Sequence, residues 1–222
     1  MKETYENGVL YMQWDQFLAP YKQAVDELKV KLKGMRRQFE HDEEEHSPIE
    51  FVTGRVKPIA SILDKANEKG IPLDKLGTEM QDIAGLRMMC PFVDDIIRVV
   101  ELLRQRNDFE IVEERDYILH RKESGYRSYH VVIIYPVQTI NGEKKILMEI
   151  QIRTLAMNFW ATIEHSLNYK YKGQFPKDIQ MRLQGAAEAA FRLDKEMSLI
   201  RGEIQEAQAF FNRKKEKKDR KK

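Results

Sequence analysis

Length and composition place the chain among soluble globular proteins. It has 222 residues, of which 42% are hydrophobic and 33% charged, and this composition is typical of one domain with long exposed helices. No run approaches the ~20 apolar residues of a membrane span, and residues 1–4 lack the apolar core of a secretion signal. The single cysteine, Cys90, excludes an internal disulfide. We therefore expect a cytoplasmic protein.

The net charge of +2 hides an uneven distribution along the chain. Residues 213–222 carry eight basic and two acidic side chains, so the other 212 residues carry a net charge of −4. A basic tail of this kind solvates a terminus or contacts nucleic acid. We expect residues 212–222 to be disordered, with single-stranded RNA as a candidate partner.

Two segments repeat apolar residues at steps of three and four, which predicts two long helices. The first covers 16–39 and the second 179–211. The 33 residues of the second would extend ~50 Å as one helix, which is longer than a domain of this size is wide. That helix is expected to pack on another subunit, with folding back onto the sheet of its own chain as the alternative.

The centre of the chain carries strand patterns. Residues 86–90 and 109–112 are predicted to be strands with a helix over 93–106 between them, and 130–137 is apolar on both faces, as expected of a central strand. The predicted fold class is therefore α+β, with a mixed β-sheet of about five strands flanked by helices and with long helices near both ends.

Residues 145–153 alternate in polarity, as a strand with two different faces does. The dipeptide Asn141-Gly142 predicts a hairpin turn, so this strand should pair antiparallel with 130–137. The polar face is either ordinary solvated surface, the favoured reading without neighbours, or one side of a site. Its side chains are Glu149, Gln151 and Arg153.

Basic residues stand two apart in the segment 53–61. Arg55 and Lys57 lie in an extended stretch that ends at Pro58, so both side chains can point the same way. Parallel cations of this kind suit an anion, most commonly a polyphosphate. Alone this signal is weak, because pairs of surface cations are frequent.

The segment 81–87 places a carboxylate before the first central strand. Asp82 could ligate Mg²⁺ and Arg87 could hold a phosphate, while Gly85 permits close approach of a ligand to the backbone. One or two carboxylates together with substrate phosphates form the usual Mg²⁺ site of nucleotide enzymes. The alternative for Asp82 is a helix cap.

The loop 122–130 mixes cations, hydroxyls and aromatic rings around Gly125, a composition suited to stacking a base and binding its phosphates. Plain loop packing is the alternative. The loop also places His130 on the strand beside Glu149. Together these segments favour phosphoryl or pyrophosphoryl transfer between nucleotides. No G-x-x-x-x-G-K-[ST] motif occurs, which excludes a P-loop enzyme.

Five ordered motifs resemble the synthetase domain of RelA/SpoT homologues, over about residues 17–211. They are T-G-R-V-K-P-I at 53–59, Q-D-I-A-G-L-R at 81–87, G-Y-R-S-Y-H at 125–130, E-I-Q-I-R-T at 149–154 and W-A-T-I-E-H at 160–165. The chain is most similar to the stand-alone small alarmone synthetases of the RelQ type. The resemblance implies a nucleotidyltransferase-like domain over 16–211, after an N-terminal extension at 1–15.

The resemblance implies a GTP pyrophosphokinase of the stringent response, which transfers the β,γ-pyrophosphate of ATP to the 3′-hydroxyl of GDP or GTP and yields AMP with ppGpp or pppGpp. Asp82 and Glu149 would bind Mg²⁺, and Glu149 would also be the general base. The residues implied for ATP are Arg55, Lys57, Ser61, Arg87 and Arg115. Those implied for the acceptor GDP or GTP are Lys122, Tyr126, His130, Gln151 and Ala161.

Regulation and assembly are implied as well. RelQ-type proteins are homotetramers that bind pppGpp as an allosteric activator, and the matching positions are Lys29, Lys33, Arg36, Glu50, Phe51, Thr53 and Asn158. The first three lie on one predicted helix face, which is either an anion-binding stripe or a solvated face. Residues 113–116, E-E-R-D, match neither common acceptor-preference signature of the long family members in full, so the resemblance does not decide between GDP and GTP.

Two other functions compete with pyrophosphate transfer. An RNA-binding regulator that senses guanosine nucleotides would use the basic tail, but such a sensor needs neither Asp82 nor Glu149. A generic nucleotidyltransferase would show a Gly-Ser followed by a D-x-D metal pair, which the sequence lacks.

Overall fold

The structure is a computed structural model that describes all residues except 1–3, 7–8, 12, 40–45, 172–174 and 220–222. Its elements in chain order are β1 (Thr4–Glu6), β2 (Val9–Tyr11), α1 (Trp14–Phe39), β3 (Phe51–Val56), α2 (Ile59–Lys69), a 3₁₀ turn (Leu73–Lys75), α3 (Leu76–Glu79), β4 (Ala84–Cys90), α4 (Val93–Arg104), β5 (Glu110–Asp116), β6 (Tyr129–Thr139), β7 (Gly142–Thr154), α5 (Leu155–Lys170) and α6 (Lys177–Asp219).

A five-stranded sheet forms the centre, with strand order β3-β4-β7-β6-β5. The β4–β7 pair is parallel and the other three pairs are antiparallel. The predicted mixed sheet of an α+β protein is confirmed. Near the N-terminus, β1 and β2 form a separate antiparallel pair.

The predicted hairpin between β6 and β7 is present. The two strands pair antiparallel along their whole length, from Tyr129 opposite Ile152 to Thr139 opposite Gly142. Gly142 has a φ of 97°, a conformation that glycine adopts without steric cost. The Asn-Gly signal therefore identified both the turn and the pairing of the strand that carries Glu149.

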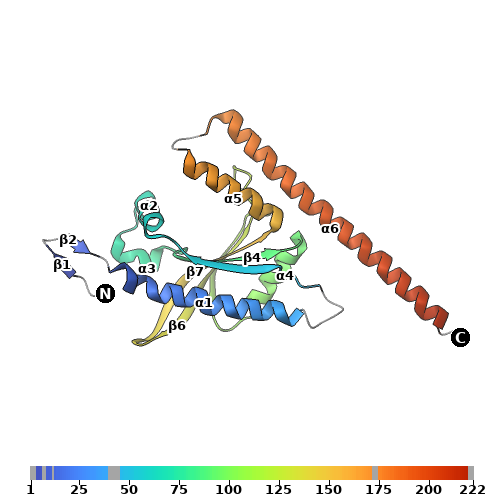
Figure 1. Ribbon diagram of the computed structural model, residues 1–222, viewed down its shortest axis with the longest axis horizontal. Coiled ribbons are helices and arrows are strands. Elements are labelled where there is room, and N and C mark those ends of the chain that lie inside the picture. The colour runs from blue at the N-terminus through green and yellow to red at the C-terminus, as the bar shows by residue number, and fades with distance from the viewer. Residues whose placement is uncertain (1–3, 7–8, 12, 40–45, 172–174, 220–222) are drawn as a thin grey trace.

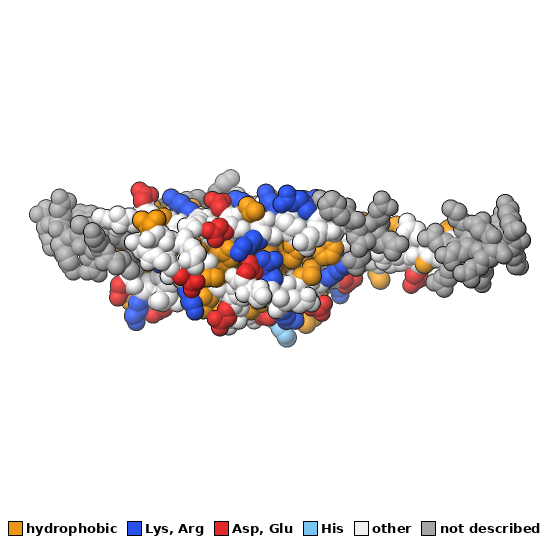
Figure 2. All heavy atoms as spheres, turned by 90° about the horizontal axis from the view of Figure 1, so that it is seen from below, with side chains coloured by type: hydrophobic (Ala, Val, Ile, Leu, Met, Phe, Trp, Pro, Cys, Tyr) orange, Lys and Arg blue, Asp and Glu red, His pale blue; other side chains and the backbone are white. Residues whose placement is uncertain are grey.

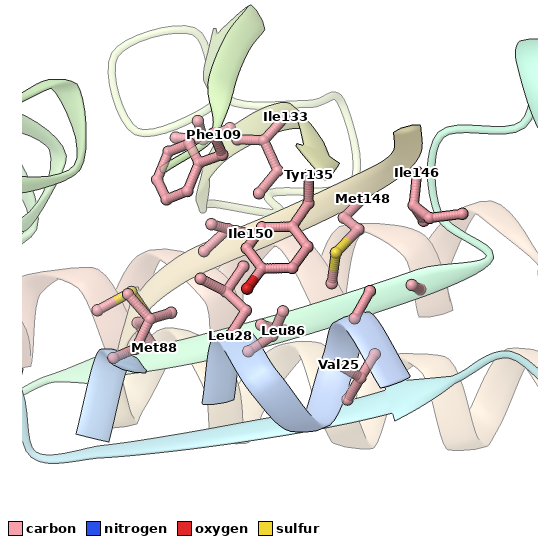
Figure 3. Packing of buried hydrophobic residues seen from close by; sticks show 14 of the residues in the cluster. Val25, Leu28, Leu86, Met88, Phe109, Ile133, Tyr135, Ile146, Met148 and Ile150 are labelled. Atoms are coloured by element: carbon pink, nitrogen blue, oxygen red, sulfur yellow. The ribbon is translucent and has the colours of Figure 1, made fainter. Parts of the chain in front are cut away.

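One face of the sheet is apolar and packs on α1. Val25 and Leu28 point from α1 toward the sheet, where Leu86, Met148 and Ile150 lie in the same buried cluster (Figure 3). The apolar side of α4 joins this cluster too. Because strand side chains alternate between faces, the opposite face holds the polar residues of the same strands.

The other side of the sheet is partly covered by α5 and by the first half of α6, which pack against each other (Figure 1). Trp160 and Ala161 of α5 form a small buried cluster with Ala187 of α6. Helices α1 and α5 thus lie on opposite sides of the sheet (Figure 1).

Helix α6 is longer than the sequence predicted. It runs for 43 residues, ~65 Å at the rise of an α-helix, and extends well past the sheet toward the C-terminus (Figure 1). The predicted helix ended at 211, and disorder was expected from 212, whereas α6 continues to Asp219.

One face of the molecule carries side chains of mixed character. Seen from below Figure 1, Lys and Arg side chains lie among acidic and apolar ones (Figure 2). None of the helices in the described part of the chain combines the length and the apolar character that a membrane crossing requires.

Candidate active site on the polar face of the sheet

The strand register gathers the polar residues into two neighbouring rows that cross the sheet. One row holds, from β3 to β5, Thr53, Arg87, Gln151, His130 and Arg115; the next holds Arg55, Gly85, Glu149, Val132 and Glu113. Residues far apart in the chain therefore lie side by side, and Glu149 stands in the central strand of the five.

A cleft of about 250 Å³ opens over the β3, β4 and β7 part of these rows. Three cations and two carboxylates share it. Its lining residues are Thr53, Gly54, Arg55, Lys57, Asp82, Gly85, Leu86, Arg87, Glu149 and Gln151. The cleft has the charge composition of a polyphosphate site with a metal ion.

Asp82 lies between two lysines at the edge of the cleft. Lys57 Nζ and Lys65 Nζ each donate to Asp82 Oδ2 over 2.6 Å. Burial alone would raise the pKa of Asp82, but the hydrogen bonds from both lysines hold it below its usual value. Burial in turn lowers the pKa of Lys57. Asp82 is therefore an ionised carboxylate at neutral pH.

Glu149 is almost fully buried and is held through both oxygens. His130 Nδ1 lies 2.9 Å from Oε1, and Gln151 Nε2 donates to Oε2 over 2.7 Å. Burial would raise the pKa of Glu149, but the hydrogen bond and charge of His130 outweigh it and lower that pKa to about 2. The predicted adjacency of His130 and Glu149 is confirmed as direct contact.

Beyond His130 the network continues to the loop that precedes β6. Tyr126 Oη lies 2.7 Å from His130 Nε2, and Arg153 donates to both Tyr126 Oη and Gln151 Oε1. Glu149, His130, Tyr126, Arg153 and Gln151 therefore form a closed ring of hydrogen bonds on the sheet.

Aromatic and cationic groups surround the Tyr126 ring. Tyr117 makes edge contacts with Tyr126 and His130, at centroid distances of 6.1 and 5.1 Å. Lys122 Nζ lies 4.8 Å from the Tyr117 ring and 5.2 Å from the Tyr126 ring. This end of the polar face provides flat rings beside cations, which suits a base and its phosphates.

Arg115 is tied to its neighbours on the polar face. Its guanidinium donates to Glu113 and to Gln81, and the hydrogen bond with Glu113 raises the pKa of Arg115. A small hollow of about 40 Å³ lies beside it and is also lined by Lys65, Asp82 and Glu149.

The remaining predicted ligands lie around the cleft. Ser61 is exposed on α2, one helical turn before Lys65. Ala161 is buried on α5 in the small cluster that Tyr126 packs against. The structure thus groups the predicted catalytic and substrate residues on one side of the sheet.

The predicted regulatory set is spread over three elements. Lys29, Lys33 and Arg36 lie on α1, and Glu50, Phe51 and Thr53 lie at the edge of the sheet, whereas Asn158 lies on α5, across the sheet from α1. Lys29 forms an ion pair with Asp26. Thr53 lines the cleft itself, so within one chain the set is divided between α1, the edge strand and α5.

Two residues of the site were missed by sequence reasoning. Lys65 could have been found, because Ser61, Lys65 and Lys69 recur every four residues on the helix that follows Arg55 and Lys57. Tyr117 directly follows the E-E-R-D segment, and no sequence pattern there indicates that its ring belongs to the site. Only the fold places it against Tyr126 and His130.

Two carboxylates of the cleft fit a magnesium ion. Asp82 and Glu149 both line the cleft. Among the described residues no group of three or more His, Cys, Asp or Glu side chains is placed to hold a metal ion by itself, so substrate phosphates would have to supply further ligands. Asp82 Oδ1 is buried without a hydrogen-bond partner in the described structure. Mg²⁺ prefers oxygen ligands of this kind, and the cations beside Asp82 suit the phosphates that would complete its coordination.

A basic cleft with two carboxylates on the polar face of a mixed sheet is the arrangement of a phosphoryl-transfer enzyme. The family model described as "Region found in RelA / SpoT proteins" matches residues 54–174. The chain belongs to the RelA/SpoT family.

Close relatives cover nearly the whole chain. GTP pyrophosphokinase YjbM of Bacillus subtilis is 68% identical over 203 residues, which are 91% of this chain and 95% of that protein. Small alarmone synthetase 1 from B. subtilis bound to its product pppGpp is similar in structure, with a TM-score of 0.84, 67% identity and coverage of 87% and 98% of the two chains. The same synthetase bound to AMPCPP matches with a TM-score of 0.77, 63% identity and the same coverage.

Proposed function

We propose that the protein is a GTP pyrophosphokinase that transfers the β,γ-pyrophosphate of ATP to the 3′-hydroxyl of GDP or GTP, producing AMP and ppGpp or pppGpp. The observation that carries the proposal is the cleft, in which the buried Glu149 and the lysine-paired Asp82 stand beside Arg55 and Arg87. The near-complete match to a GTP pyrophosphokinase supports it.

The ATP site is assigned to the β3, β4 and α2 side of the cleft. Arg55, Lys57 and Arg87 line it and would bind the phosphates, with Ser61 and Lys65 on the adjoining helix. Arg115 would contact the nucleotide from β5. Cations that are already in place do not have to reorganise when charge develops during the transfer. Such electrostatic stabilisation is the main source of catalysis in phosphoryl transfer.

Asp82 and Glu149 would hold Mg²⁺. When bound, the ion would neutralise charge on the phosphates of ATP and make the β-phosphorus easier to attack. Asp82 is suited to the role because its carboxylate is ionised and one oxygen lacks a protein partner in the described structure.

Glu149 would also accept the proton of the attacking hydroxyl. The 3′-oxygen forms a bond to the β-phosphorus, the bond from that phosphorus to the α,β-bridging oxygen breaks, and AMP leaves with the electron pair. With its pKa at about 2, Glu149 is ionised at neutral pH and can accept a hydrogen bond from the hydroxyl. Proton transfer becomes favourable as the attacking oxygen gains acidity in the transition state.

The acceptor site is assigned to the Tyr126 end of the polar face. Tyr126 would stack on guanine, and Lys122 and His130 would hold the 5′-phosphates. Gln151 and the backbone near Ala161 would orient the ribose and base. His130 contacts both Tyr126 and Glu149, so the acceptor would be bound next to the group that removes its proton.

We also propose assembly into a homotetramer with pppGpp as an allosteric activator. Exposed apolar residues form a stripe along α6 at Leu193, Met197, Ile200 and Ile204, and β3 is an edge strand with Phe51 exposed. Contact with other copies would cover such surfaces and would bring the regulatory residues of different chains together. A cytoplasmic location and binding of single-stranded RNA by the tail stay predictions.

Incubation of the protein with labelled ATP, Mg²⁺ and either GDP or GTP tests the proposed reaction. The expected products are AMP and a guanosine nucleotide with a 3′-pyrophosphate, with no free pyrophosphate accumulating. Glu149→Gln is the matched control, since it keeps the size of the side chain and removes the charge. Intact ATP with both acceptors, in the presence and absence of pppGpp, would overturn the proposed function.

A further inference from the structure

The loop that carries Lys122 and Tyr126 is a tight turn whose two ends meet. Lys122 N donates to Tyr126 O over 3.3 Å, and Gly125 N donates to Lys122 O over 2.9 Å. Gly125 has a φ of 90°, which a residue with a side chain rarely adopts. The loop therefore has a defined shape, but its backbone bonds alone do not attach it to the rest of the molecule.

The first half of α6 lies directly against the outside of this loop. Gln184 Nε2 donates to Glu123 O. A Cβ atom at Gly125 would lie only 2.6 Å from Cβ of Ala187, so the helix and the loop are in closest packing there. The position of the loop over the sheet is thus set by the position of α6.

Glu188, one residue after Ala187, joins the two ends of the loop. Its Oε2 atom accepts from Arg121 over 3.0 Å and from Arg127 over 2.9 Å. Arg121 precedes Lys122 and Arg127 follows Tyr126, so a single carboxylate oxygen bridges the residues on either side of the turn. The hydrogen bond from Arg127 lowers the pKa of Glu188. A glutamate is ionised at neutral pH even with its ordinary pKa, so the bridge is charged there.

Arg127 is itself fixed on α6. Its side chain is buried, and its guanidinium lies 4.1 Å from the centre of the Phe191 ring. Charge-assisted hydrogen bonds of a buried guanidinium are among the stronger polar contacts in proteins. Tyr126 is therefore held from one side by Arg153 and His130 of the sheet, and its loop is held from the other side by α6.

We propose that Glu188 is a positioning residue for the acceptor nucleotide. It holds Arg121 and Arg127 in place, and the loop between them then presents Lys122 and Tyr126 in the arrangement that binds a guanosine nucleotide. This inference rests on the proposed function and extends it to a helix outside the five family motifs. Preorganisation improves binding because the loop and its side chains lose their conformational entropy during folding, before the ligand binds.

Helix α6 has other anchors that do not involve the loop. Thr154 donates to the buried Asp194, and Arg201 pairs with Asp95 at the start of α4. Loss of the Glu188 contacts should therefore leave α6 in place and release only the loop. The matched pair for the test is Glu188→Gln and Glu203→Gln, since Glu203 is exposed on the same helix ~22 Å further along.

The experiment measures KM for ATP, for GDP and for GTP, together with kcat and the midpoint of thermal unfolding. Glu188→Gln is expected to raise KM for both acceptors about three- to tenfold, with KM for ATP and kcat changed less than about twofold, because only the binding of one substrate is weakened. Glu203→Gln should match the wild type in all of these. An equal rise of KM for ATP and the acceptors, or unchanged acceptor KM values, would overturn the proposal.

A double variant shows whether Glu188 acts through the bridge. Arg121→Gln should raise the acceptor KM as well, and in Glu188→Gln/Arg121→Gln the rise should be smaller than the product of the two single effects. A fully multiplicative double variant would contradict the bridge. If the wild type itself makes no 3′-pyrophosphorylated nucleotide, the proposed function fails instead. An unfolding midpoint of Glu188→Gln equal to that of the wild type shows that a raised acceptor KM does not come from misfolding.

Discussion

The two faces of β7 show how one strand serves stability and chemistry separately. Glu149 and Ile150 are neighbours in the chain, yet Glu149 stands in the network of hydrogen bonds on the polar face and Ile150 lies in the core under α1 (Figure 3). Both side chains are buried. Apolar packing holds Ile150 in place, whereas charge and hydrogen bonds hold Glu149. Substitutions one residue apart should therefore damage different properties.

The largest expected effect is the loss of turnover in Glu149→Gln. Removing the carboxylate takes away the proposed proton acceptor and one proposed metal ligand, so the rate of AMP formation should fall by about 10³-fold or more, ~4 kcal/mol in the barrier. Initial rates at saturating ATP and acceptor measure this. A variant that kept a tenth of the wild-type rate would show that turnover does not depend on the Glu149 carboxylate.

The neighbouring change, Ile150→Ala, should affect folding instead. Deleting a fully buried aliphatic side chain leaves a cavity and costs about 2–5 kcal/mol of stability. Urea unfolding monitored by circular dichroism measures the loss, and KM for ATP in the folded fraction should stay at the wild-type value. A large change of KM without loss of stability would contradict the division between the two faces.

At the edge of the cleft, Lys65→Gln should weaken ATP binding and leave binding of the acceptor unaffected. Lys65 contacts Asp82 at the cleft edge, and loss of one charged hydrogen bond to a phosphate should raise KM for ATP about tenfold. Lys75→Gln is the matched control, because Lys75 is an exposed lysine outside the two pockets. Equal KM values for the two variants would remove Lys65 from the site.

The smallest effect should be a pH-dependent contribution of Glu149 to stability. Its pKa is lowered from 4.5 to about 2 in the folded protein, so the ionised form stabilises the fold fully above pH 4.5 and loses this contribution as the pH falls toward 2. The difference in stability between the wild type and Glu149→Gln should therefore shrink as the pH falls from 7 to 3, because the ionised carboxylate makes stronger hydrogen bonds than a neutral group does. A difference that stays constant from pH 7 to pH 3 would contradict the lowered pKa.

Local sequence patterns identified several parts of the structure correctly. The alternation in 145–153 and the Asn141-Gly142 turn predicted the β6–β7 hairpin, because strand periodicity and turn chemistry involve only neighbouring residues. The extent of α6 was underestimated, since its last part lacks the apolar spacing on which the prediction relied and depends on helix propensity.

The site was predicted in its residue types and only partly in its contacts. The motifs placed cations, carboxylates and aromatic residues on the correct segments, and the chain order made His130 and Glu149 neighbours. No local pattern could pair Lys57 with Asp82 or place Tyr117 beside His130, because these contacts depend on how strands and helices from different parts of the chain are arranged.

The amino-acid sequence by itself determined which residue types alternate along each strand, where the chain turns, and the family to which the motifs point. The tertiary structure alone decided the register that aligns Arg55, Gly85 and Glu149 across three strands, and the docking of α6 on the loop of Tyr126. The physical reason is that alternation and turns arise from interactions between residues close in the chain, whereas the cleft and its supporting helix arise from contacts between residues tens of positions apart.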